Sequence, residues 1–383
     1  MDNMKENLLF CIFFSYFFDK SANMCYHILY HRVHRVYPGE HFYIRSFPMK
    51  QHICAAALAL ALLLQTTACT SGETEPAGPI TLTDQCGRTV TLDKPAETIV
   101  SCYYVSSYAV MALGLSENLV GIENKADTRP IYSLGAPQFL ELPAVGTMKE
   151  SNVELIASLA PDLVIMPEKL AESAEVLNGL GLDVLLVNPE NHEDLCEMLT
   201  LIGDACGASE EADGLIAYYD AQKAALEALT AEADAPVVYM GGNSSYLTTA
   251  PADMYQSSLI DLAGGINAGA ELEGDYWTEV SYETILSYNP DVIVLPSGAD
   301  YTVDDILSDS QLSSLTAVQN GAVYAMPSAL EEWDSPIPSG ILGAMWLTSV
   351  LHPSLYSSET FAADAVSFYE TFYGFTPDAE LLK

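Results

Sequence analysis

One pattern of sixteen residues occurs twice in the chain, as 152-NVELIASLAPDLVIMP-167 and as 281-SYETILSYNPDVIVLP-296. Both copies place a Glu seven residues before Pro-Asp and thirteen before a second Pro, and they lie 129 residues apart. Each copy is typical of a short helix that begins at a polar residue and is stopped by Pro, followed by an apolar run that suits a buried parallel strand. A period this long predicts two lobes of similar construction.

Strand-like apolar runs alternate with amphipathic helical stretches around each copy, which is typical of α/β lobes with parallel sheets. Between them, residues 209–233 are rich in Ala, Glu, Leu, Tyr and Lys and lack Pro, which predicts one helix of about 30 Å or more. We therefore expect two parallel-sheet sandwiches: an N-terminal lobe at residues 80–207, a linker helix at 208–233 and a C-terminal lobe at 234–383. A stiff helical linker would disfavour large hinge closure.

The composition excludes two classes of protein. The 383 residues include 14 Lys+Arg and 52 Asp+Glu, a formal net charge of -38, yet 50% are hydrophobic, which is too apolar for a disordered acidic chain. A pI near 4.1 makes nucleic-acid binding improbable, because that role needs clustered Lys and Arg.

The first 48 residues differ from the rest, and four of the seven His lie there. We interpret 1–48 as an upstream extension from a misassigned start codon; a structured N-terminal arm is the alternative. Residues 49–68 then form a signal peptide, with a basic start at Met49-Lys50 and an apolar run from Ala55 to Leu64.

The signal ends in Thr66-Thr-Ala-Cys69, which resembles a bacterial lipoprotein signal, although Thr66 stands where Leu is usual. Cys69 would carry the lipid, and residues 69–79 have the small, polar composition of a tether. Ordinary signal-peptidase cleavage is the alternative. The expected location is the cell envelope, at the outer face of the cytoplasmic membrane or in the periplasm, with a lipid anchor.

Four further cysteines follow Cys69. Cys196 and Cys206 fall in one predicted helix, too far apart for a bridge. Cys86 and Cys102 could form a disulfide, or all four could be buried thiols. No Cys/His cluster has the spacing of a zinc site, so we expect no bound metal of that kind.

Several short motifs now point to one family. Their order is Asp84-Gln-Cys-Gly-Arg-Thr-Val90, Thr98-Ile-Val-Ser101, Gly114-Leu115, the two repeats, Gly264-Gly-Ile-Asn267, Trp277 and Leu351-His-Pro353. Across about residues 80–375 the chain resembles substrate-binding proteins of ABC importers for iron-siderophore, haem and vitamin B12. The resemblance implies a bilobal fold with a ligand cleft between the lobes, delivery to a membrane permease, a monomer, and a protein that has no cofactor and is not an enzyme.

The repeated Glu residues gain a role from this resemblance. In similar proteins an exposed Glu on each lobe pairs with Arg of the permease, and Glu154 and Glu283 match those positions. The alternative is that each Glu merely stabilises the first turn of its helix.

Ligand-binding side chains are expected in loops that follow the carboxyl ends of strands and face the other lobe. For each candidate the alternative is a packing role in the core or at the surface. Trp346, which falls in a helical run, is expected in the core. The candidates are Tyr103, Tyr104, Tyr108, Arg129, Lys149 and Glu168 in the first lobe, and Tyr246, Trp277, Tyr301 and the stretch Glu331, Glu332 and Trp333 in the second. Aromatic rings offer flat faces to a macrocycle or catechol, and Arg or Lys can meet anionic groups.

A ferric siderophore is our first expectation for the cargo. A corrinoid or haem is the alternative, since Arg and Lys are scarce, and molybdate or tungstate is less favoured. Direct capture of zinc or manganese is disfavoured, because only His192 and His352 follow Cys69.

A chelatase-like enzyme is the alternative from a different class, since such chemistry also uses a cleft between two lobes. The sequence has no Gly-x-Ser-x-Gly elbow, P-loop or Gly-x-Gly-x-x-Gly, which disfavours it.

Overall fold

The computed structural model describes residues 78–274 and 276–383. The predicted extension, the signal peptide, Cys69 and most of the tether lie outside the described residues, so these interpretations stay predictions. No helix in the described part is long and apolar enough to cross a membrane.

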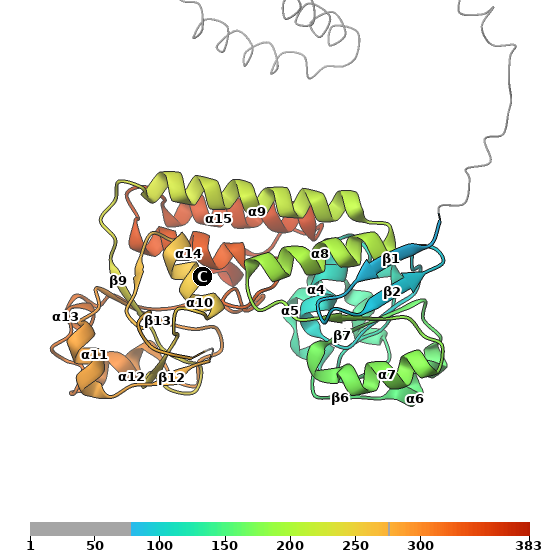
Figure 1. Ribbon diagram of the computed structural model, residues 1–383. Coiled ribbons are helices and arrows are strands. Elements are labelled where there is room, and N and C mark those ends of the chain that lie inside the picture. The colour runs from blue at the N-terminus through green and yellow to red at the C-terminus, as the bar shows by residue number, and fades with distance from the viewer. Residues whose placement is uncertain (1–77, 275) are drawn as a thin grey trace, which may run out of the picture. The chain divides into compact units, whose positions relative to one another are not determined.

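The N-terminal lobe is built on a parallel sheet with strand order β4-β3-β7-β8, preceded by an antiparallel β1-β2 hairpin (Figure 1). Its strands are β1 (Ile80–Thr83), β2 (Thr89–Leu92), β3 (Ile99–Ser101), β4 (Leu119–Gly121), β5 (Gly146–Thr147), β6 (Glu150–Ser151), β7 (Leu163–Pro167) and β8 (Val184–Val187). Its helices are α4 (Tyr104–Ala112), α5 (Pro130–Gly135), α6 (Val153–Leu159), α7 (Ala171–Gly179) and α8 (His192–Cys206), with short 3-10 turns at Ser116–Asn118, Ala126–Thr128, Pro137–Glu141 and Glu168–Leu170.

The C-terminal lobe repeats this plan with a parallel sheet of order β11-β9-β13-β14. Its strands are β9 (Val237–Met240), β10 (Thr248–Thr249), β11 (Ile266–Asn267), β12 (Thr278–Glu279), β13 (Val292–Leu295) and β14 (Val323–Ala325). Its helices are α10 (Tyr255–Leu262), α11 (Tyr282–Tyr288), α12 (Val303–Ser308), α13 (Thr316–Asn320), α14 (Ile341–Leu351) and α15 (Ser358–Phe372), and a 3-10 turn at Ala379–Leu382 follows. The predicted α/β class with two parallel-sheet lobes is confirmed.

The sixteen-residue repeat folds the same way in both lobes. The side chains of Asn152 and Ser281 cap α6 and α11 by accepting from the backbone N–H of Leu155 and Thr284. Each helix ends at a residue in the left-handed region, and the strand that follows is buried throughout.

The Asp of each Pro-Asp pair fastens the repeat to the neighbouring strand. The Asp162 carboxylate accepts from the backbone N–H groups of Glu97 and Thr98 just before β3. Asp291 accepts from the backbone N–H of Val237, the first residue of β9. The repeat therefore specifies a helix, a strand and the register of the adjacent strand.

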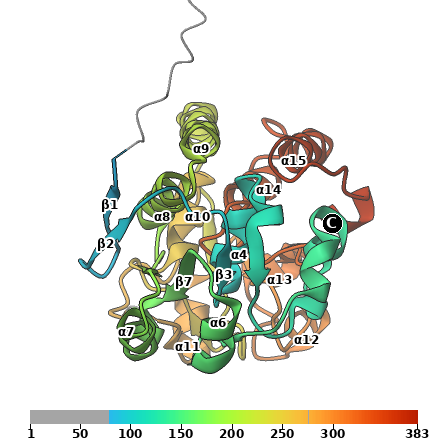
Figure 2. The ribbon, with the colours of Figure 1, turned by 90° about the vertical axis from the view of Figure 1, so that its right-hand side faces the viewer.

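The predicted linker is the helix α9 (Ser209–Thr230), whose 22 residues make it about 33 Å long. The Tyr219 hydroxyl donates to the carbonyl of Ile337 and accepts from the backbone N–H of Ile341, which ties α9 to the start of α14. The ring of Tyr218 packs on Phe368 and Phe372 of α15, and Figure 2 shows α9 seen nearly end-on beside α14 and α15.

The four described cysteines, Cys86, Cys102, Cys196 and Cys206, are free thiols. The disulfide considered for Cys86 and Cys102 is therefore absent from the structure. Cys102 and Cys206 are buried thiols, as the alternative predicted, whereas Cys86 and Cys196 are only partly buried. Burial raises the pKa of Cys102 to about 12, so this thiol is unreactive at neutral pH.

Candidate ligand-binding site

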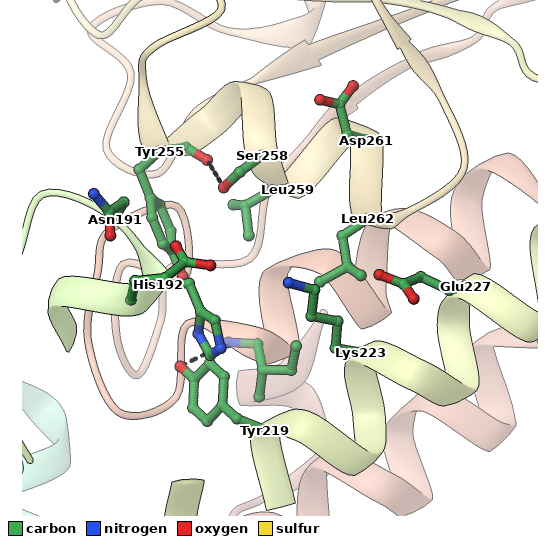
Figure 3. A pocket seen from close by; sticks show the side chains of 12 residues that line it. Asn191, His192, Tyr219, Lys223, Glu227, Tyr255, Ser258, Leu259, Asp261 and Leu262 are labelled. Atoms are coloured by element: carbon green, nitrogen blue, oxygen red, sulfur yellow. Dashed lines mark hydrogen bonds between the residues drawn. The ribbon is translucent and has the colours of Figure 1, made fainter. Parts of the chain in front are cut away.

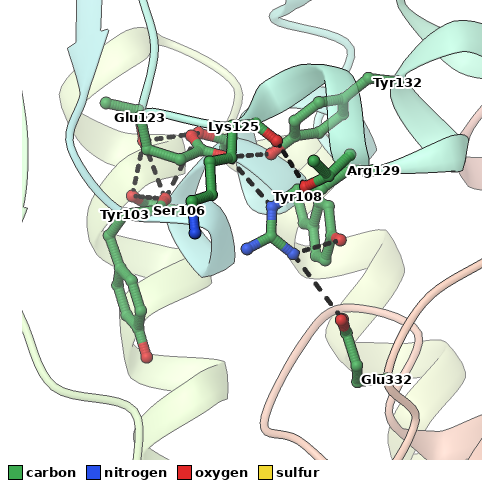
Figure 4. A network of polar contacts seen from close by, with 11 residues as sticks. Tyr103, Ser106, Tyr108, Glu123, Lys125, Arg129, Tyr132 and Glu332 are labelled. Carbon is green, nitrogen blue, oxygen red and sulfur yellow. Dashed lines mark hydrogen bonds and ion pairs between the residues drawn. The ribbon is translucent and has the colours of Figure 1, made fainter. Parts of the chain in front are cut away.

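Arg129 lies at the centre of a polar and aromatic cluster at the carboxyl end of the first sheet (Figure 4). It precedes Pro130, the first residue of α5, in an extended backbone conformation. Its Nη1 donates to the Tyr108 hydroxyl at 3.1 Å, and its Cζ lies 4.1 Å from the centre of the Tyr104 ring. Its Nε lies 3.4 Å from Oε1 of Glu123.

Glu123 is the buried acid that holds this cation. It follows β4 by two residues, is 4% exposed, and accepts hydrogen bonds from Ser107 and Tyr132. Burial raises the pKa of Glu123, while these hydrogen bonds and Arg129 act in the opposite direction. The carboxylate is thus satisfied from several sides, which a buried charge requires.

Edge-to-face aromatic contacts extend the cluster. Neighbouring ring centres in the series Tyr103, Tyr104, Tyr108 and Tyr132 lie 5.2 to 5.6 Å apart. Tyr103 and Tyr104 are partly exposed, so they can present ring surface to a ligand. Tyr108 is only 1% exposed, and its hydroxyl accepts the hydrogen bond from Arg129. Its predicted direct contact with a ligand is therefore not supported, because its ring lies in the core.

The second lobe contributes Glu332, which reaches toward Arg129 in Figure 4. Its Oε2 lies 3.8 Å from Nη1 of Arg129 and accepts no hydrogen bond. The flanking acids are buried: burial raises the pKa of Glu331 to about 7 and that of Asp334 to about 6. One cation therefore faces a loop that carries three carboxyl groups.

Trp333 lies between these acids, and its predicted role needs correction. It is 1% exposed, its Nε1 donates to the Tyr369 hydroxyl at 2.9 Å, and its ring packs on Phe361. Because the Tyr369 hydroxyl satisfies the indole N–H, the Trp333 side chain can be buried without leaving a polar group unpaired. Trp333 belongs to the hydrophobic core.

Tyr246, Trp277 and Tyr301 gather around Gly241 and Gly242, which directly follow β9. The Tyr246 and Tyr301 rings meet edge-to-face at 5.3 Å, and the Tyr246 hydroxyl donates to Asp309. A Cβ at Gly241 would clash with the Tyr301 hydroxyl, and one at Gly242 would lie 3.1 Å from the Trp277 ring. The two glycines therefore permit these aromatic rings to lie against the strand end.

Among the described residues, no hydrogen bond or ion pair connects the side chain of Lys149 or Glu168 to the Arg129 cluster. Lys149 is exposed in the turn between β5 and β6, and Glu168 is exposed directly after β7. Both stay predictions. Arg88, by contrast, is structural, since it pairs with Asp84 at 2.8 Å and donates to the carbonyl of Val184.

Sequence reasoning missed Glu123 and Tyr132. Glu123 follows β4, a three-residue strand whose run Leu119-Val-Gly121 is too short to be distinctive. Applying the strand-end rule to that run would have found it. Glu332 lies within the predicted stretch from Glu331 to Trp333, and the structure places its carboxylate beside Arg129.

Glu154 and Glu283 occupy matching places, each the second residue of its helix and each exposed. Figures 1 and 2 place α6 and α11 on the side of the lobes away from α9. Their predicted role in docking stays a prediction, although both are accessible.

A cavity of about 300 Å³ lies elsewhere, between the start of α8, α9 and α10 (Figure 3). Its walls include His192, Tyr219, Lys223 and Asp261, and the His192 ring stacks on Tyr219 at 4.8 Å. None of the predicted ligand residues lines it. Its volume is at the lower limit of small-molecule sites, so a macrocyclic cargo would not fit, and we base the candidate site on the Arg129 cluster instead.

The sequence pattern of the family described as "Periplasmic binding protein" matches residues 99–330. The chain belongs to this family. The predicted resemblance is thereby confirmed, and the match covers both sheets and the linker helix.

Curated relatives of this periplasmic binding protein include YvrC of Bacillus subtilis, an uncharacterized ABC transporter substrate-binding lipoprotein, which is 28% identical over 64% of this chain and 77% of its own length. The molybdate-binding protein MolA of Haemophilus influenzae is 24% identical over 78% and 92%. A vitamin B12-binding protein of Vibrio cholerae is 26% identical over 61% and 81%.

Among solved structures, a periplasmic solute binding protein from Veillonella parvula aligns with a TM-score of 0.70 at 26% identity, covering 79% of this chain and 95% of that one. The chain is therefore a substrate-binding protein of the kind that serves ABC importers, and proteins of this family work outside the cytoplasm. These relatives are binding proteins of transport systems, and the expectation that the chain is not an enzyme rests on them.

Proposed function

We propose that this protein captures a metal complex of low net charge, a corrinoid before others, and delivers it to an ABC permease. The choice of cargo rests on the ion pairs of Arg129, a first-lobe cation that also contacts the second lobe. Arg129 already lies between the carboxylates of Glu123 and Glu332. The site therefore offers little free positive charge to an anionic ligand.

The aromatic residues support the same choice. Partly exposed Tyr103 and Tyr104 on one lobe, and Trp277 with Tyr246 and Tyr301 on the other, offer ring faces to a broad apolar ligand. A corrinoid without net charge matches such surfaces, and the Vibrio cholerae relative is named for vitamin B12.

A ferric siderophore, our first expectation from the sequence, becomes the second candidate. The neutral kind, in which three hydroxamates balance ferric iron, meets the same charge requirement. Haem, with its two propionates, and molybdate, the ligand for which the Haemophilus influenzae relative is named, carry negative charge that Glu332 would oppose.

Isothermal titration of the full-length chain with cyanocobalamin, haemin, a ferric tris-hydroxamate and molybdate tests the cargo. We expect saturable one-to-one binding of cyanocobalamin. Trp277→Phe should weaken it about tenfold, because the indole face is lost. Trp333→Phe is the matched control, since that ring is in the core, and it should leave the affinity within about twofold. Binding of molybdate with no response to cyanocobalamin would refute the choice.

A further inference from the structure

We propose that Glu332 sets the charge selectivity of the ligand site, by neutralising Arg129 from the opposite lobe and repelling anionic cargo. This inference rests on the proposed function, because it concerns the same site. It assigns a specific role in charge selection to one residue of the predicted stretch from Glu331 to Trp333.

The two acids that flank Arg129 differ in how they are held. Glu123 is buried and fixed by hydrogen bonds from Ser107 and Tyr132, all within the first lobe. The Glu332 side chain is 44% exposed, comes from the other lobe, and has Arg129 as its ion-pair partner at 3.8 Å. Glu123 is therefore fixed within the first lobe, whereas the described residues give the Glu332 carboxylate an ion pair with Arg129 and no hydrogen bond to its Oε2.

The other contacts of the guanidinium make its charge hard to redirect. The Tyr104 ring covers one face of the group, and Nη1 is already bonded to the Tyr108 hydroxyl. With 20% of its side chain exposed, Arg129 cannot turn away from Glu332 without leaving these partners. An incoming anion must therefore either compete with Glu332 for Nη1 or remain close to an unbalanced carboxylate.

Two further carboxyl groups lie close to Glu332 in the same loop. Glu331 and Asp334 lie one and two residues away, and both carboxyl groups are buried beneath the loop. The described residues place Arg129 alone among cations within ion-pair distance of this acidic loop. A neutral ligand meets none of this repulsion, so the loop acts as a filter on charge.

Two iron chelates of similar coordination separate charge from shape. Ferric iron with three hydroxamates is uncharged, whereas ferric iron with three catecholates is trianionic. Binding of both chelates and of cyanocobalamin is measured by isothermal titration for the full-length wild type, for Glu332→Gln, and for Glu279→Gln, which removes an exposed acid of the same lobe.

We expect Glu332→Gln to raise the affinity for the tris-catecholate about 10-fold to 100-fold while changing the two neutral ligands by less than about threefold. The gain should shrink as salt is added, a response that a purely structural role would not produce. Glu279→Gln should behave like the wild type, and thermal unfolding confirms that each variant is folded.

An equal change for neutral and anionic ligands, or no gain for the tris-catecholate in the folded variant, would overturn the role of Glu332. Failure of the wild type to bind cyanocobalamin would instead refute the corrinoid cargo. In that case, a tris-catecholate affinity that rises in Glu332→Gln but not in Glu279→Gln would still support charge selection by Glu332. No rise in Glu332→Gln would still overturn that role.

Discussion

Glu331 is a carboxyl group that the fold has removed from water. It is 1% exposed and accepts hydrogen bonds from the hydroxyls of Tyr369 and Tyr373. Burial raises its pKa to about 7, whereas the unfolded chain would have the ordinary value of about 4.5. Between these values the folded state binds the extra proton, so Glu331 stabilises the fold at low pH and this contribution is lost as the pH rises through about 7.

We therefore predict that the free energy of unfolding of the wild type contains a component that falls from pH 5 to pH 7, by at most about 1.4 kcal/mol per pH unit. Glu331→Gln mimics the protonated form and should flatten the curve over this range. Urea unfolding at pH 5, 6 and 7 measures it. Asp334, with a pKa of about 6, leaves a smaller slope in both proteins. Identical slopes in the variant and the wild type would show that Glu331 is ionised in the fold.

At the same scale, a scarce cation and aromatic residues that follow a strand can be recognised in the sequence, and these signals led to the prediction of Arg129 and Tyr104. The structure places the two side chains in contact. Sequence reasoning misplaced Trp333, since a Trp in a loop can face solvent or turn inward. The decision depended on Tyr369, 36 residues away, which offers the hydroxyl that the indole N–H needs. Such partners are set by tertiary packing, and the sequence does not reveal them.

The sixteen-residue repeat acts at the scale of elements, where its two Asp residues make unequal contacts. Asp162 accepts from the backbone N–H groups of Glu97 and Thr98 and from the Thr98 hydroxyl. Asp291 accepts from the backbone N–H of Val237. The first lobe should therefore depend more on its Asp than the second.

We predict that Asp162→Ala lowers the free energy of unfolding by about 2–3 kcal/mol and Asp291→Ala by about 1 kcal/mol. Chemical denaturation of both variants beside the wild type measures the difference. Equal losses, or a greater loss for Asp291→Ala, would mean that these hydrogen bonds do not fasten the sheets as described.

The sequence predicted individual helices and strands better than it predicted side-chain contacts. The repeat, with its caps, Pro stops and apolar runs, predicted α6, β7, α11 and β13, and the Pro-free run after Gly214 predicted most of α9. These signals lie within each segment, and the fold of each lobe keeps the helices and strands that they favour. Short strands such as β4 and β11 lack enough residues to give a period, so they depend on pairing with β3 and β9.

For the whole molecule, the exposed pair Glu154 and Glu283 predicts how cargo is handed over. Reversing both charges, as Glu154→Lys with Glu283→Lys, should abolish uptake through the permease and leave ligand affinity unchanged, because neither residue is part of the Arg129 cluster. Uptake of radiolabelled cyanocobalamin and titration of the purified protein measure the two effects separately.

The matched control is Glu175→Lys with Asp304→Lys, which reverses one exposed charge on each lobe in α7 and α12. It should retain uptake. If the control and the test pair lose uptake equally, net charge explains the effect and specific docking does not. If the test pair loses affinity, the two Glu residues are part of the ligand site.

Hydrogen exchange of the full-length chain with saturating cyanocobalamin shows both whether this cargo binds and which residues it covers. If cyanocobalamin binds between the lobes, exchange should slow in residues 102–108, beside the Arg129 cluster, and in residues 241–246, at the two glycines after β9. Exchange at the start of α8 and in α10 should stay unchanged. Protection confined to the cavity between α8, α9 and α10, or no protection anywhere, would contradict this prediction.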